Sequence, residues 1–145
     1  MSSNGLHIQH RYLELPESFF THVQPNPLKD PKMVCFNHDL AQEMGFHSDN
    51  LAQWEKVGGG SELLAGMEPV AMKYTGHQFG VYNPNLGDGR GLLLWETVAP
   101  NGQRWDWHLK GAGITPYSRF GDGRAVLRST LREYLCSEAD RKSVV

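Results

Sequence analysis

The sequence predicts an α+β fold in which an antiparallel sheet is followed by one long helix. Residues 91–98 are apolar enough for a buried strand, and residues 104–110 alternate between apolar and polar side chains. The pair Asn101-Gly102 between them is a strong signal for a short hairpin. Residues 125–138 then carry apolar side chains at helical spacing. With 145 residues, the chain is long enough for one domain or for one lobe of a larger protein.

Residues 1–70 are expected to form an N-terminal extension with short helices. Each proline fixes its own φ angle and pushes the preceding residue towards extended geometry, which predicts extended pieces near residues 11–15 and 32–36. Asn37 can cap a following helix that a glycine at position 45 would end. A second helix is predicted at residues 49–56, where the glycines that follow would break it. The prolines are Pro16, Pro25, Pro27 and Pro31.

Residues 71–145 are expected to hold the sheet and the long helix. Shorter strands at about 71–74 and 80–82 precede the two stronger ones. In the last strand, alternation places Lys110 on the polar face, beside glycines that allow a ligand to approach closely. The apolar face carries Trp105, Trp107 and Leu109, and the polar face carries Arg104, Asp106, His108 and Lys110.

The motif Gly-Asp-Gly-Arg occurs twice, at 87–90 and at 121–124. The second copy is predicted to open the long helix, with Asp122 as its N-cap residue. Along that helix, side chains spaced by about one helical turn form an apolar stripe. These are Leu127, Leu131, Tyr134 and Leu135.

The charge pattern favours a small anionic ligand over a nucleic acid. The net charge of the chain is −2, which does not indicate a nucleic-acid-binding protein. Between Gly87 and Arg132, however, seven Lys and Arg residues stand against four acidic ones. This local excess indicates an anion site, although a solvated basic surface would give the same count.

The composition disfavours several other classes of protein. Cys35 and Cys136 lie far apart, so a disulfide framework is not expected and a reduced, cytoplasmic setting fits better. No Cys or His pair has the spacing of a zinc site, so no metal ligands are predicted in this chain. No apolar run reaches about 18 residues, and the N-terminus lacks the core of a signal peptide. A membrane partner is therefore not expected.

The residues around the first turn have the chemistry of a phosphate-binding cradle. Gly87 and Gly89 let backbone N–H groups approach a ligand without interference from side chains. Arg90 adds a fork of donors, Lys110 adds a point charge, and a second turn at a helix start would favour an anion. The aspartate inside each turn would repel phosphate unless it points away.

A lysine removed from water needs a partner of opposite charge, and Glu133 in the long helix is the natural candidate. A strand lysine paired with a glutamate on the next helix is the arrangement of kinase-like nucleotide sites. The order of glycine loop, hairpin, strand lysine and helix glutamate is also that of a kinase N-lobe. Spacing alone leaves a second interpretation open, a small α+β domain with glycine-rich hairpins and no ligand.

Three long stretches closely resemble the selenoprotein O family. They are LPESFFTHVQPNPLKDPKMVCFN at 15–37, YTGHQFGVYNPNLGDGRGLLLWE at 74–96 and DWHLKGAGITPYSRFGDGRAVLRSTLREYLCSEA at 106–139. The resemblance extends over nearly the whole chain, from about Tyr12 to Ala139. It implies a protein-kinase-like fold, of which this chain would be the N-lobe portion, with the long helix in the position of kinase helix αC.

The resemblance also implies an activity. Members of the family transfer AMP, rather than phosphate, from ATP to Ser, Thr or Tyr hydroxyls of proteins, and they bind ATP in the reverse of its kinase orientation. It implies that Lys110 binds phosphate and that Glu133 is its ion-pair partner, both in catalytic roles. The residues expected to contact ATP are Gly87, Gly89, Arg90, Lys110, Asp122 and Gly123.

The end of the chain departs from the family pattern. Family members continue into a large C-lobe, which carries the catalytic Asp base and the Asn and Asp ligands of Mg²⁺ or Mn²⁺. This chain instead reads ADRKSVV, so the C-lobe has no counterpart in it. We therefore expect the N-terminal part of a protein adenylyltransferase that is inactive by itself. The alternative is a truncated, non-catalytic nucleotide-binding fragment.

Overall fold

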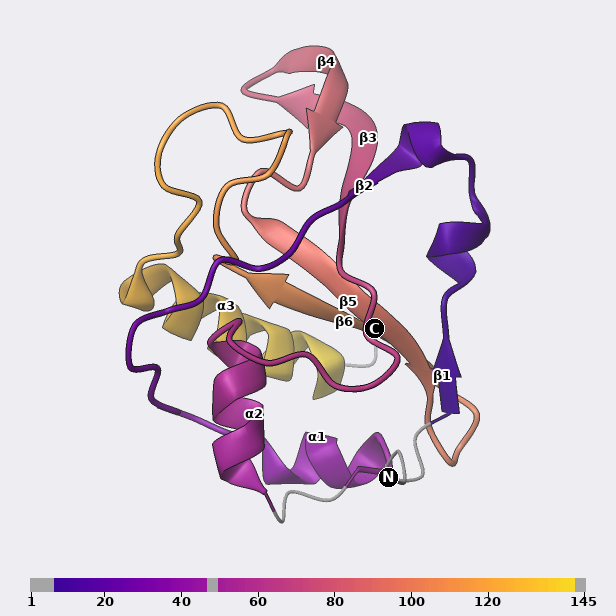
Figure 1. The fold of residues 1–145 in the computed structure, drawn as a ribbon, viewed down its shortest axis with the longest axis vertical. Coiled ribbons are helices and arrows are strands. Elements are labelled where there is room, and N and C mark those ends of the chain that lie inside the picture. The colour runs from indigo at the N-terminus through magenta and orange to yellow at the C-terminus, as the bar shows by residue number, and fades with distance from the viewer. Residues whose placement is uncertain (1–6, 47–49, 143–145) are drawn as a thin grey trace.

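The computed structural model describes residues 7–46 and 50–142 and confirms an α+β fold with an antiparallel sheet (Figure 1). The strands of the described part are β1 (His7–Gln9), β2 (Phe20–His22), β3 (Val70–Gln78), β4 (Val81–Gly87), β5 (Gly91–Val98) and β6 (Arg104–Lys110). Its α-helices are α1 (His38–Glu43), α2 (Leu51–Gly58) and α3 (Leu127–Lys142), and two 3-10 helices are η1 (Arg11–Glu14) and η2 (Glu17–Phe19).

Strand β5 is the centre of the sheet. It pairs with β6 along its length and with β1 near its C-terminal end. Strand β3 pairs with β2, β4 and β5, so β1 and β2, from the first part of the chain, belong to the same sheet as the later strands. Figure 1 shows the β3–β4 hairpin projecting beyond the β5–β6 pair, with the loop that precedes α3 beside its base.

The apolar run of β5 forms the core of the sheet. Leu92 is fully buried, and Leu94 and Trp95 belong to the same cluster as Ala71 of β3. A strand that is covered on both faces carries apolar residues at successive rather than alternate positions. The strand predicted at 91–98 is confirmed at both of its ends.

Strand β6 alternates as predicted, with the tryptophans and leucine half-buried and the polar side chains exposed. Trp107 stacks on Trp54 of α2, with ring centroids 5.4 Å apart, and contacts Phe46 at 5.0 Å. Its indole N–H donates to the Thr97 hydroxyl of β5 at 2.9 Å, which satisfies the polar atom of a half-buried ring. The tryptophan face of β6 packs against α2, and the opposite face of the strand, which carries Lys110, is exposed.

The hairpin between β5 and β6 is confirmed, and its loop consists of Pro100, Asn101 and Gly102. The Gly102 N–H donates to the Ala99 carbonyl, and the Ala99 N–H donates to the Gln103 carbonyl, both at 2.8 Å. Gly102 has a φ of +83°, the left-handed conformation that follows the turn in hairpins of this length. The glycine of the Asn-Gly pair therefore closes the turn rather than forming its centre.

Both short helices of the N-terminal region are confirmed, each with an asparagine cap. The Asn37 side chain accepts a hydrogen bond from the Leu40 N–H at 3.0 Å, and Asn50 accepts one from the Gln53 N–H at 3.2 Å. The predicted start of the second helix at residue 49 lies outside the described residues. None of the helices in the described part is long and apolar enough to cross a membrane.

The extended piece predicted at 11–15 is wrong, because residues Arg11–Glu14 form a 3-10 helix. The Leu13 N–H donates to the His10 carbonyl at 3.1 Å, and the Tyr12 N–H donates to the carboxylate of Glu96 on β5 at 2.8 Å. Pro16 constrains only the residue before it, Leu15, which is extended. Pro16 therefore predicts extended geometry for Leu15 only, and not for residues 11–14.

The long helix is confirmed, but the prediction of its start was wrong. It begins at Leu127 instead of residue 125. Of the predicted apolar stripe, Leu131 is half-buried, whereas Leu127, Tyr134 and Leu135 are exposed. Leu127 is 59% exposed and Leu135 is 66% exposed. Polar contacts attach α3 to the remainder of the described structure, including a 2.8 Å hydrogen bond from the Asn37 amide to the Glu138 carboxylate.

We predict that Asp106→Asn stabilises the chain at neutral pH. Burial raises the pKa of Asp106, Glu96 opposite it on β5 raises that pKa further, and His108 opposes the shift. A carboxyl with a raised folded-state pKa favours the fold when protonated, and this contribution is lost as pH rises through that pKa. The melting temperature at pH 7 should rise by about 1–2 °C, as expected for a partly solvated charge.

The matched control for this variant is Asp30→Asn, which removes an exposed loop carboxyl. Thermal melts between pH 3 and pH 7 measure the difference between each variant and the unmodified chain. The advantage of Asp106→Asn should vanish below about pH 4, the ordinary pKa of aspartate. An advantage that persisted unchanged into acid would contradict the electrostatic explanation.

Candidate functional site

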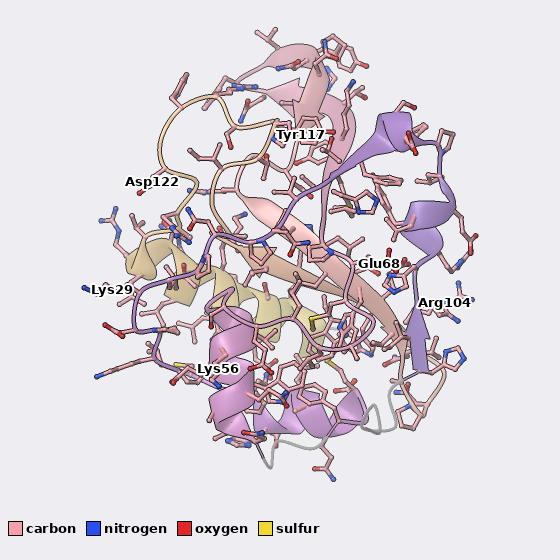
Figure 2. The ribbon with its side chains drawn as sticks, in the orientation of Figure 1. Lys29, Lys56, Glu68, Arg104, Tyr117 and Asp122 are labelled. Atoms are coloured by element: carbon pink, nitrogen blue, oxygen red, sulfur yellow. The ribbon has the colours of Figure 1, made fainter. Side chains whose placement is uncertain are left out.

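The first glycine turn, residues 87–91, connects β4 to β5 and packs closely against a neighbouring loop. A Cβ atom at Gly87 would lie 2.5 Å from the ring of Tyr117, so no larger residue fits there. The Tyr117 hydroxyl lies 2.9 Å from the hydroxyl of Thr21 on β2. Figure 2 shows Tyr117 at the base of the β3–β4 hairpin, where these contacts fix the turn against the sheet.

The hydrogen bonds of this turn leave donors rather than acceptors unpaired. In the part of the chain that the structure describes, no hydrogen bond involves the backbone N–H of Gly89 or of Arg90. The carbonyls of Asp88, Gly89 and Arg90 are all occupied. Asp88 O accepts from Thr115 Oγ1 (2.6 Å), Gly89 O accepts from Ser118 Oγ, and Arg90 O accepts from the N–H groups of Gly111 (2.7 Å) and Ala112 (3.2 Å). Such a turn suits an anion.

The Asp88 carboxylate points into the protein, which removes the repulsion expected from the sequence. It is 10% exposed, lies 3.2 Å from Nε2 of His108, and accepts a hydrogen bond from the Met72 N–H at 3.0 Å. Burial, followed by the charge of Asp88, raises the pKa of Tyr74 and of Tyr12. The negative charge of the turn therefore lies beside His108, Tyr74 and Tyr12.

Lys110 lies at the end of β6, opposite Gly91 at the start of β5. Its Nζ is 3.6 Å from Oε2 of Glu133 on α3, so the structure brings the predicted pair together. Both side chains are about half exposed, at 45% and 53%. The Arg90 side chain is also exposed, and the ion pairs of the described residues do not include it.

The second glycine turn does not start a helix, so the predicted N-cap role of Asp122 is wrong. Its carboxylate accepts a hydrogen bond from the Arg124 N–H at 2.9 Å, two residues along, and α3 begins only at Leu127. Aspartate commonly forms such a local turn when the chain does not continue into a helix. Figure 2 shows Asp122 at the outside of the loop that leads to α3.

Gly123 connects the second turn to the loop after β6. It has a φ of +70°, and its carbonyl accepts a hydrogen bond from the Gly113 N–H at 3.2 Å. A Cβ atom there would lie 2.0 Å from the Gly113 carbonyl carbon. The residue next to it, Arg124, donates to the carbonyls of Asn26 (2.6 Å) and Pro27 (3.0 Å). The second turn is thus held next to the end of β6.

A cavity of about 370 Å³ lies beside Lys110, between α3 and the segment before α1. Its walls include apolar side chains of α3 and of the earlier segment, together with Lys110 and Arg124. In the described residues, no group of three or more His, Cys, Asp or Glu side chains could hold a metal ion.

Sequence reasoning did not identify Thr115, Ser118 or the His108–Asp88 pair as parts of this site. The only signal was that Thr115 and Ser118 lie within the ITPYSRFGDGR stretch that carries the resemblance. Together, the unpaired donors of the glycine turn, Arg90, and the Lys110–Glu133 pair have the chemistry that binding an anion such as a phosphate requires.

The comparisons with known proteins identify the family. The family model described as "Protein adenylyltransferase SelO" matches residues 3–142, so the chain belongs to this family. The "Protein nucleotidyltransferase YdiU" of Vibrio cholerae is 55% identical over 136 residues, which cover 94% of this chain and 28% of that protein. The protein of the same name from Vibrio vulnificus strain CMCP6 is 58% identical over 131 residues, covering 89% of this chain and 26% of that protein.

A third relative with that name, from Aliivibrio fischeri strain ES114, is 54% identical over 138 residues. The aligned residues cover 94% of this chain and 28% of that protein. The chain therefore spans less than a third of the length of the curated relatives it matches.

We predict that Gly123→Ala destabilises the chain far more than Gly121→Ala does. Both positions have positive φ, +70° and +95°, but a Cβ atom at Gly121 meets nothing within 4 Å. Conformational strain alone should cost each variant about 1 kcal/mol. The collision with the Gly113 backbone should add about 2 kcal/mol or more at Gly123, measured by urea denaturation. Equal losses would show that the two loops are not in contact.

Proposed function

We propose that this chain supplies the nucleotide-binding part of a protein adenylyltransferase, which transfers AMP from ATP to Ser, Thr or Tyr hydroxyls of proteins. The observation that carries this proposal is the donor-only glycine turn beside the Lys110–Glu133 pair, in a chain of the SelO family. The names of the relatives, protein nucleotidyltransferases, support a nucleotide and a protein as the two substrates.

In this proposal the first turn holds the triphosphate. Gly87 and Gly89 allow close approach, while Arg90 and Lys110 provide positive charge. The protein hydroxyl gives its proton to the Asp base that the family resemblance implies in the C-lobe, and its oxygen attacks the α-phosphorus of ATP. The bond from that phosphorus to the α–β bridging oxygen breaks, and pyrophosphate leaves. Arg90 and Lys110 stabilise the charge that develops on pyrophosphate, and Glu133 holds Lys110 in position.

The proposed arrangement is that of a kinase N-lobe. Residues 71–145 would form the lobe, with β6 carrying the lysine and α3 in the place of helix αC, while residues 1–70 form an extension. Asp122 and Gly123 would contact the nucleotide from the loop that is held beside Gly111 and Gly113. This placement is supported by the hydrogen bond between Gly113 and Gly123.

We propose a cytoplasmic protein that uses ATP with Mg²⁺ or Mn²⁺. Cys35 and Cys136 are both free thiols, which fits a reducing compartment. The described residues do not offer the ligand set that a divalent cation needs.

The position of the retained label distinguishes AMP transfer from phosphorylation. A full-length protein carrying this sequence is incubated with a protein substrate and with ATP labelled at either the α- or the γ-phosphate. Label retained from the α position supports the proposal. Label retained only from the γ position would replace it with a phosphorylating kinase, and retention of neither would favour a non-catalytic nucleotide-binding protein.

We predict that Lys110→Ala lowers the rate of AMP transfer by about 10² to 10³, the usual effect of removing one group that stabilises transition-state charge. Glu133→Gln should lower it by about tenfold, because the lysine remains but is held less firmly. The control is Lys56→Ala, which breaks the 3.8 Å pair between Lys56 and Glu62 elsewhere on the surface. Turnover of α-labelled ATP measures all three, and an unchanged rate for Lys110→Ala would refute the assigned role.

A further inference from the structure

The loop after β6 contacts the first glycine turn on the side away from its free N–H groups. Thr115 and Ser118 of this loop bring two hydroxyls to the backbone of the turn. The loop itself is compact, because the Ser118 N–H donates to the Thr115 carbonyl at 3.0 Å. Figure 1 shows this loop passing beside the base of β4, where the turn begins.

The hydrogen-bond partners of the two hydroxyls determine their orientation. Oγ of Ser118 accepts a hydrogen bond from the Thr115 N–H at 2.9 Å, and Oγ1 of Thr115 accepts one from the Tyr117 N–H at 3.2 Å. Each hydroxyl therefore has its own proton available to donate. Thr115 donates to the Asp88 carbonyl at 2.6 Å, and Ser118 donates to the Gly89 carbonyl. Thr115 is buried, with 6% of its surface exposed.

These two bonds orient the two peptide groups on either side of Gly89. In a planar trans peptide, the C=O and the N–H point in opposite directions. A carbonyl of Asp88 held towards Thr115 therefore directs the Gly89 N–H away from the loop. In the same way, the bond from Ser118 to Gly89 directs the Arg90 N–H away from it.

Without the two hydroxyls, the orientation of these two peptide groups would not be fixed. Glycine at position 89 permits many backbone conformations, including ones in which a peptide flips and presents its carbonyl to the ligand. A carbonyl oxygen facing phosphate repels it, whereas an N–H attracts it. The turn thus depends on Thr115 and Ser118 for the direction of its donors.

We propose that Thr115 and Ser118 are positioning residues, which direct the Gly89 and Arg90 N–H groups towards the polyphosphate of the nucleotide. This inference rests on the proposed function and adds to it the two residues that make the turn selective for an anion. Neither hydroxyl touches the ligand, since each is committed to backbone groups of the turn and of its own loop.

The test uses the full chain labelled with ¹⁵N and inorganic tripolyphosphate as the probe. Amide shifts of Gly89 and Arg90 report where the probe binds, and their titration gives its affinity. Ser118→Ala and Thr115→Val each remove one hydroxyl and should weaken binding about tenfold, the typical effect of losing one buried hydrogen bond. Thr115→Ser keeps the hydroxyl and should restore binding to within about twofold of the unmodified chain.

Ser61→Ala is the matched control, because the Ser61 hydroxyl also donates to a backbone carbonyl, that of Lys56, at 3.2 Å but away from the turn. It should leave the affinity for tripolyphosphate unchanged. Thermal melts identify any variant that loses its fold. If Thr115→Val does so, Ser118→Ala decides the question, since it removes the other hydroxyl of the pair and adds no new group.

Equal affinity of the unmodified chain, Ser118→Ala and Thr115→Val would overturn the positioning role and leave the proposed function intact. Weakened binding by Ser61→Ala, or failure of Thr115→Ser to restore it, would also overturn that role. If tripolyphosphate shifted neither amide in the unmodified chain, the inference would fall, and the labelled-ATP experiment on the full-length protein would still decide the proposed function independently.

Discussion

The geometry of the site depends first on the register between β5 and β6. Val98 lies opposite Arg104 next to the hairpin, the register shifts by one residue between Leu93 and Trp95, and Gly91 then lies opposite Lys110. The hairpin and this bulge together fix the pairing at the lysine. Side chains alternate along a strand, and a slip of one residue would turn Lys110 towards the core and Trp107 towards solvent. Packing of Trp107 against Trp54 and Phe46 opposes that slip, and hydrophobic burial on one face thereby places a charge on the other.

The second requirement is that groups repelling an anion point away from the open side of the turn. The Asp88 carboxylate is directed inwards to His108 and the Met72 N–H. The carbonyls of the turn are directed to the loop after β6 and to the first residues following Lys110. When a peptide N–H of the turn faces outwards, the carbonyl of the same peptide group faces inwards and needs a donor. A hydroxyl or an N–H from a neighbouring segment supplies a donor to each of these carbonyls.

The Lys110–Glu133 pair has a different physical character from a buried ion pair. Because both side chains are about half exposed, water screens their attraction, and such pairs typically contribute about 1 kcal/mol or less to stability. The pair therefore matters for where the lysine charge is held rather than for holding the fold together. Helix α3 adds a second polar attachment through Glu138 and Asn37, while much of its apolar stripe remains exposed.

The sequence by itself determined the elements whose signals are local. The continuous apolar run of β5, the alternation of β6, and the asparagine cap of α1 each depend on neighbouring residues, and each is found where it was predicted. Lys110 and Glu133 were also paired in advance, because a strand charge needs a partner and the next helix offers one. The family resemblance, spread over long stretches, needed no structure either.

Only the tertiary structure decided the features that join distant segments. The Tyr12 N–H, in the 3-10 helix Arg11–Glu14, bonds to the carboxylate of Glu96, a partner 84 residues along the chain. Asp122 bonds to the Arg124 N–H rather than capping a helix, since Arg124 itself is tied to Asn26 and Pro27. Likewise, the direction of the donors at the first turn is set from 115–118, nearly thirty residues along the chain. Such contacts follow from how the chain folds back on itself, and no local pattern encodes them.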